Sequence, residues 1–293
     1  MDATYHKAFK ARLITNNRES GLLNRCASAS RYVYNWALAD RIYHYKIGEK
    51  TNRFDQCKRF NAIKDELCPW IRELPYAIVN FSFLHLDSAY QNFFRRVKGG
   101  AEKAGFPKFK NRYSSKAFTI NGAIKVEPTR VRLPVIGWMR LMEHDYIPVD
   151  ADILYATMTE RAGNWYISVT CEIPQPDQTT GVGGVIGVDV GIKTLASLST
   201  GETFYNPRPI YQYEAKLKRL QRELARRTRG GKNYKKTLAK KQAVEEKIRN
   251  IRGYAQHTAS TAIIDKNPAT VVVESLNVSG MLKNHKLARS ISD

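Results

Sequence analysis

Two acidic residues lie in or directly after apolar runs in the C-terminal half of the chain. Asp189 lies inside the run 185–190, and Glu274 directly follows residues 270–273. Such runs are typical of strands buried on both faces of a sheet, where a carboxylate must be paired, hydrogen-bonded or bound to a metal. On neighbouring strands, the two acids could hold Mg²⁺, as in nucleases whose two metal ions lie about 4 Å apart. Pairing with Lys or Arg is the alternative for either acid alone; both together, in so basic a chain, favour a metal site.

A second feature is the cationic segment 216–252, which holds 15 Lys and Arg residues against three acids. Leu, Val and Ile recur there at roughly helical spacing around Gly230-Gly231, which predicts a helical hairpin with a buried stripe and a cationic outer face. The excess of 12 positive charges would repel itself without a polyanion. Aromatic residues and lysines also alternate in residues 105–110, which suits contacts to nucleic acid, although a packed turn explains that segment equally well. The predicted nucleic-acid-binding residues are Lys216, Lys218, Arg219, Arg222, Arg226, Arg227, Arg229, Lys232, Lys235, Lys236, Lys240, Lys241, Lys108 and Lys110.

The whole chain is basic. Its 293 residues include 48 Lys and Arg against 27 Asp and Glu, a net charge of +21, and 43% are hydrophobic. Such a chain can form packed cores in about two domains. Its charge predicts a polyanionic partner, for which nucleic acid is the first expectation and an acidic membrane surface the second. The four cysteines lack C-x-x-C spacing, so no zinc site is expected. The sequence has neither a long apolar run nor an apolar leader, so we expect no membrane span. We expect a cytoplasmic protein of a prokaryote that is associated with the nucleoid when it is bound to DNA.

The order of predicted elements suggests how these residues are positioned. One early strand precedes about 90 helical residues, and several strands follow, which favours a small β-barrel with a helical domain inserted after its first strand. Two sequential domains are the alternative. After a polar linker, strands, long helices and a further strand predict an α/β sheet, so the fold class is α+β with several domains. The expected strands are 7–14, 117–120, 123–126, 130–133, 153–160, 165–173, 185–190, 195–199, 203–205 and 270–273, and the expected helices are 19–46, 54–67, 75–99 and 211–265.

Several motifs then resemble one family. The sequences GVDVGIKTLA around Asp189 and VVVESLNVSGM around Glu274 resemble the first two RuvC motifs of the TnpB (OrfB) proteins of insertion-sequence transposons. RYVYNWALA, AYQNFFRRVK, GFPKFK and the closing NHKLARSISD resemble other parts of these proteins, in the same order. The resemblance runs from about Lys7 to Asp293.

The resemblance implies a domain plan. Residues 1–15 and 106–176 would form an OB-like β-barrel (the wedge), and 16–105 an inserted helical recognition domain. Residues 177–184 would be a linker, and 185–293 an incomplete RuvC-like domain of ribonuclease-H fold. TnpB proteins, ancestors of small type V CRISPR effectors, bind a guide RNA and cut double-stranded DNA beside a short adjacent motif. The positions expected to read that motif are Phe54, Lys58, Tyr76 and Asn80, whose residue types favour a different motif from that of known members.

One departure from the family pattern concerns the third RuvC acid. It lies in a D-R-D-x-N-A-A-like segment that follows a zinc ribbon, and this chain stops at Asp293 before both. We therefore expect Asp189 and Glu274 to bind Mg²⁺ weakly, with little or no cleavage and no zinc in this chain.

This pattern favours an RNA-guided, nuclease-inactive DNA-binding protein, similar to TnpB-like repressors of transcription. A truncated form of an active Mg²⁺-dependent nuclease is one alternative, and a guide-independent DNA-binding accessory to transposition is another.

Overall fold

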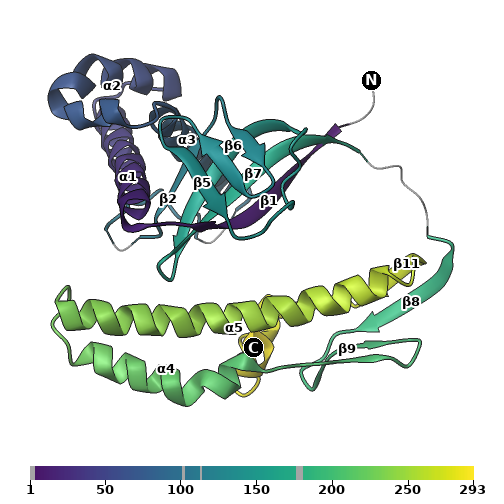
Figure 1. The fold of residues 1–293 in the computed structure, drawn as a ribbon. Helices are drawn as coiled ribbons and strands as arrows, with labels where there is room; N and C mark the ends of the chain where they lie inside the picture. The colour runs from purple at the N-terminus through teal and green to yellow at the C-terminus, as the bar shows by residue number, and fades with distance from the viewer. Residues whose placement is uncertain (1–3, 101–102, 113, 176–180) are drawn as a thin grey trace. The chain divides into compact units, whose positions relative to one another are not determined.

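The computed structural model describes residues 4–100, 103–112, 114–175 and 181–293, which form two compact units, Met1–Gln175 and Pro176–Asp293 (Figure 1). A large antiparallel sheet with helices makes up the first unit, and a smaller mixed sheet with a helical hairpin makes up the second. The predicted combination of helices and sheets is therefore confirmed at this level. The expected linker 177–184 lies half outside the described residues, and its last two residues already belong to a strand.

The seven-stranded sheet of the first unit is organised around the first strand of the chain. β1 (Thr4–Ile14) pairs antiparallel with β7 (Asn164–Pro174) along most of its length, and its end pairs with β5 (Gly137–Leu141). Three helices follow β1, and the chain then returns to the same sheet. The sheet order is β2-β6-β7-β1-β5-β4-β3, where the other strands are β2 (Ala117–Ile120), β3 (Lys125–Glu127), β4 (Arg130–Leu133) and β6 (Asp152–Arg161).

Local signals define the helices between β1 and β2. Asn16 and Glu19 form a capping box at the start of α1 (Asn17–Lys46), and Asn52 with Asp55 does the same for α2 (Arg53–Leu67). A short 3-10 helix, η1 (Pro69–Glu73), precedes α3 (Ala77–Lys98). Trp36 of α1, Phe60 of α2 and Phe83 of α3 meet edge to face, with ring centroids 4.9–6.2 Å apart. This aromatic cluster joins the three helices to one apolar core that also includes the sheet.

The second unit contains a four-stranded sheet of order β10-β9-β8-β11. β8 (Gly183–Asp189), β9 (Thr194–Leu198) and β10 (Thr203–Tyr205) are antiparallel neighbours, whereas β11 (Pro268–Val273) runs parallel to β8. The crossover between β10 and β11 is the hairpin of α4 (Pro209–Ala225) and α5 (Lys232–Ile264), and the short helices α6 (Val278–Met281) and α7 (Ala288–Ser292) follow. No helix among the described residues is both long and apolar enough to cross a membrane.

The expectation that both apolar strands of this sheet are buried on both faces is wrong. Ile186 and Val188 of β8 are buried in a small cluster with Ile263 of α5, but Val185 is 65% exposed. Every residue of β11 from 269 to 273 is exposed. Within the described part of the chain, β11 is an edge strand, and α5 packs against one face of the sheet only. A continuous apolar run therefore does not establish burial here.

Candidate acidic site and nucleic-acid interface

The two predicted acids lie at the same end of two parallel strands. Asp189 is the last residue of β8, and Glu274 directly follows β11. The last paired residues of the two strands are Val188 and Val273, so the acids are one step further along each strand. Adjacent strands lie about 4.8 Å apart, and equivalent positions on them share a face. The register thus places Asp189 and Glu274 at equivalent positions of neighbouring strands, one residue beyond the pair Val188 and Val273.

Both acids are exposed, which corrects the argument that burial forces them to be paired. Two adjacent carboxylates still suit a divalent cation, because Mg²⁺ binds through one or two carboxylates while it keeps several waters. Among the described residues, no group of three or more His, Cys, Asp and Glu side chains is placed to hold a metal ion. The Asp293 carboxylate accepts hydrogen bonds from the backbone N–H groups of Ile210 (2.7 Å) and Tyr211 (3.1 Å), so it caps α4.

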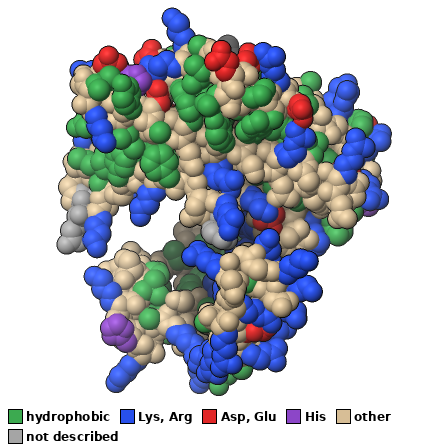
Figure 2. All heavy atoms as spheres, turned by 90° about the vertical axis from the view of Figure 1, so that its left-hand side faces the viewer, with side chains coloured by type: hydrophobic (Ala, Val, Ile, Leu, Met, Phe, Trp, Pro, Cys, Tyr) green, Lys and Arg blue, Asp and Glu red, His purple; other side chains and the backbone are tan. Residues whose placement is uncertain are grey.

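The cationic segment forms the α4–α5 hairpin, whose two helices meet along a narrow seam. Leu220 of α4 and Val244 and Ile248 of α5 are buried in this seam. The buried Thr237 hydroxyl donates to the Glu223 carboxylate at 3.0 Å, which adds a polar link between the helices. Because the seam is narrow, most of each helix surface faces solvent. Figure 2 shows Lys and Arg side chains gathered over the end of this unit where the hairpin turns.

The twelve predicted cations of the hairpin differ in their partners. Lys218, Arg227 and Lys241 form ion pairs with Glu214, Glu223 and Glu245, each four residues away on the same helix. Arg229 is exposed and has an interaction of its own. A larger group is exposed and has no carboxylate within 4.0 Å among the described residues; it consists of Lys216, Arg219, Arg222, Arg226, Lys232, Lys235, Lys236 and Lys240. Within this group Lys232, Lys236 and Lys240 recur every four residues, so they form one stripe along α5.

The aromatic and basic segment 105–110 has no regular secondary structure, and it contacts the helices through some of its side chains. The Phe106 ring packs edge to face on Tyr90 and Phe93 of α3. Lys110 is half-buried, with its Nζ 4.0 Å from the centre of the Tyr34 ring, and this burial lowers the pKa of its ammonium group. Lys108 is exposed. Of the two predicted cations in this segment, Lys108 is therefore the more available to a ligand.

The four candidates for reading an adjacent motif are all exposed, and the structure groups two of them. Phe54 of α2 and Asn80 of α3 line one hollow of about 370 Å³. Lys58 and Tyr76 do not line this hollow; the Tyr76 hydroxyl instead exchanges hydrogen bonds with the Asn61 amide at 3.0–3.2 Å. The hollow also contains residues that the sequence did not single out, namely Arg53, Cys57, Phe81, Leu84 and Asn121. The Asn121-Gly122 turn was visible in the sequence, but its approach to α2 and α3 was not.

Comparison with known proteins decides the family. The OrfB_IS605 family model, described as "Probable transposase", matches residues 168–285. The "Putative RNA-guided DNA endonuclease InsQ" of Escherichia coli (strain K12) is 32% identical over 285 residues, which cover 95% of this chain and 68% of that protein. The chain belongs to the TnpB (OrfB) family. The family assignment made from the sequence motifs is therefore confirmed, and the matched region includes both Asp189 and Glu274.

Other matches extend along this TnpB-family chain. A "Putative RNA-guided DNA endonuclease" of Streptomyces pristinaespiralis is 32% identical over 303 residues, which cover 98% of this chain and 71% of that protein. A solved Cas12f1–sgRNA–target DNA complex has a TM-score of 0.47 and 14% identity, over 90% of this chain and 66% of that chain, slightly less than two thirds.

A model described as "Helix-turn-helix domain" matches residues 1–50. In this structure that region contains β1 and the single continuous helix α1, so its geometry differs from that description.

Proposed function

We propose that this TnpB-family protein is an RNA-guided protein that binds double-stranded DNA. The observation that carries the proposal is the row of cations along α4 and α5 that have no carboxylate partner in the described part of the chain; it lies in the same unit as the two strand-end acids. Each phosphate that such a cation contacts releases condensed counter-ions, which favours binding to RNA and DNA backbones without regard to sequence. Base pairing with a guide would then supply the sequence specificity. Relatives named as RNA-guided DNA endonucleases support this assignment.

The finer assignments are part of the same proposal. A sheet of order β10-β9-β8-β11, with three antiparallel strands and one parallel strand, supports a RuvC-like domain of ribonuclease-H fold. After β1 the chain forms three α-helices and then returns to the same sheet. This order supports an OB-like wedge with an inserted recognition domain. The hollow that holds Phe54 and Asn80 is the proposed reader of the adjacent motif.

Purification from cells tests guided binding. We expect a discrete small RNA to co-purify, and the loaded protein to shift a matched DNA duplex but not a scrambled one. If no discrete RNA is recovered and RNA-free protein binds a specific DNA sequence, the protein is a guide-independent DNA-binding factor and the proposal is wrong.

We further propose that this polypeptide binds its target without cleaving it and acts as a repressor. Asp189 and Glu274 can hold one Mg²⁺, whereas cleavage with two metal ions requires more ligands. The bound ion would supply a positive charge beside a DNA phosphate, and the two carboxylates would position it. Loaded protein, matched plasmid and Mg²⁺ should give no nicked product. Cleavage that disappears in Asp189→Ala would show an active nuclease instead.

A further inference from the structure

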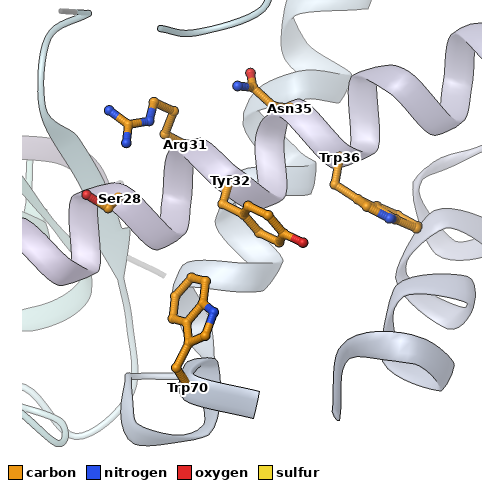
Figure 3. A pocket seen from close by; sticks show the side chains of 6 residues that line it. All are labelled: Ser28, Arg31, Tyr32, Asn35, Trp36 and Trp70. Carbon is orange, nitrogen blue, oxygen red and sulfur yellow. The ribbon is translucent and has the colours of Figure 1, made fainter. Parts of the chain in front are cut away.

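A groove on the N-terminal unit combines aromatic side chains with an arginine. It lies between α1 and η1 and has a volume of about 510 Å³, within the usual range of ligand pockets, about 300–1,000 Å³. Figure 3 shows Trp70 directed from η1 toward Tyr32 on α1. The residues that line the groove are Ser28, Arg31, Tyr32, Asn35, Trp36 and Trp70.

The aromatic side of the groove is held in place but remains open. The Tyr32 and Trp70 rings meet edge to face, with centroids 5.8 Å apart and planes at 70°. Partial burial of Tyr32 raises the pKa of its hydroxyl. The Trp36 ring packs edge to face against the rings of Phe60 and Phe83, which hold it in position. Trp70 is 39% exposed, so much of its ring is available to a ligand.

The polar side of the groove is cationic. Arg31 is half-buried, and no carboxylate lies within 4.0 Å of its guanidinium among the residues that the structure describes. A second hollow, of about 300 Å³, shares Ser28 and Arg31 with the first and adds Lys110 and Lys116. The Asn35 amide donates to the Lys110 carbonyl and accepts from the Lys110 N–H, both at 2.8 Å, which fixes this segment against α1. Arg31 thus lies where the two hollows join.

The same groove is lined by an exposed tryptophan and by an arginine that has no carboxylate partner among the described residues, and this combination matches the chemistry of an unpaired nucleotide. The base can stack on an aromatic ring, and the phosphate can pair with the guanidinium. A duplex is a poor ligand, because its bases are already stacked and paired. A phosphorylated peptide would use Arg31 but would leave the aromatic rings without a role.

We propose that this groove binds one unpaired nucleotide of the guide RNA, with its base on Trp70 and Tyr32 and its phosphate at Arg31. The inference rests on the proposed function, because a guide RNA has looped or single-stranded nucleotides whereas the DNA target is double-stranded before it is opened. The groove would therefore hold the RNA to the N-terminal unit independently of the cations on α4 and α5.

Variants at exposed tryptophans test the proposal in the full chain. Trp70→Ala removes the proposed stacking surface, and Arg31→Gln removes the proposed phosphate partner. Trp138→Ala is the matched control, because Trp138 is 37% exposed and also lies beside an arginine, with the Arg130 guanidinium carbon 4.3 Å from its ring centre, but lies outside the groove. RNA-stripped protein is titrated with the co-purifying RNA, and in a parallel arm with single-stranded DNA of the same sequence.

We expect Trp70→Ala to weaken RNA binding about five-fold or more, which corresponds to the loss of one base stack. Trp70→Phe should restore most of the affinity, Arg31→Gln should weaken binding, and Trp138→Ala should change it less than about two-fold. Cross-linking of 4-thiouridine-substituted RNA should place adducts on residues 28–36 or 70.

The results separate two kinds of failure. If the unsubstituted protein binds no RNA, both the proposed function and the groove assignment are wrong. If it binds RNA but Trp70→Ala and Trp138→Ala behave alike, or if the cross-links lie elsewhere, only the groove assignment is wrong. A loss confined to single-stranded DNA would overturn the assignment to guide RNA.

Discussion

The stripe of unpaired lysines along α5 gives the sharpest prediction. Replacing Lys232, Lys236 and Lys240 together by Gln removes three exposed charges that have no carboxylate partner among the described residues. Each phosphate contact contributes about 0.9 to the slope of log affinity against log salt for duplex DNA, and about 0.7 for a single strand. The triple variant should therefore lower the slope by about 2.1–2.7. At 0.1 M salt, relative to 1 M, this corresponds to a loss of affinity of about 130- to 500-fold.

The assay is fluorescence anisotropy with labelled RNA and duplex DNA over a range of salt concentrations. The control triple variant replaces Lys218, Lys241 and Arg249 by Gln; each is on the same hairpin, but each is already paired with a glutamate. Both variants lose three charges, and Gln is a good helix former, so helicity should be unchanged by circular dichroism. Equal slopes for the two variants would mean that overall charge, and not the unpaired stripe, governs binding. An unchanged slope in the first variant would refute the interface.

Three further predictions concern individual side chains. Asp189→Asn should raise the melting temperature in EDTA, because it removes the repulsion between residue 189 and Glu274. It should also abolish any rise in melting temperature that Mg²⁺ causes. The same Mg²⁺ response in the variant and the unsubstituted protein would contradict the metal site. Asp293→Ala removes the cap of α4 and should lower the free energy of unfolding of the C-terminal unit by about 1 kcal/mol in urea titrations; no change would mean that the cap does not stabilise the helix. Phe60→Ala should lower the free energy of unfolding by about 3–5 kcal/mol, because Phe60 is fully buried. Phe54→Ala on the same helix should lower it by less than about 0.5 kcal/mol, because Phe54 is 71% exposed. Similar losses for the two variants would contradict the packing of α2.

Much of the secondary structure could be predicted locally. Helical spacing predicted α1 from residue 19 onward, whereas the Asn16 cap directly before its start was seen only in the structure; Gly48, which has φ = +78°, follows the end of the helix. Strand β5 was missed because Gly137–Leu141 is short and lies next to Pro134, so no local pattern distinguishes it from a turn. Its pairing with the end of β1 creates this strand, and that partner lies more than 120 residues earlier in the chain.

By itself, the sequence determined the types of most elements, the cationic character of the hairpin and the family, because periodicity, charge and motifs are local properties of the chain. The tertiary structure alone decided which charges and faces are available. It placed Asp189 and Glu274 at equivalent, exposed positions of neighbouring strands and assembled Trp70, Tyr32 and Arg31 into one groove. It also paired some hairpin cations with glutamates and left others without a carboxylate partner among the described residues. The physical reason is that burial, ion pairing and concavity depend on what packs against a residue. Those neighbours come from distant parts of the chain.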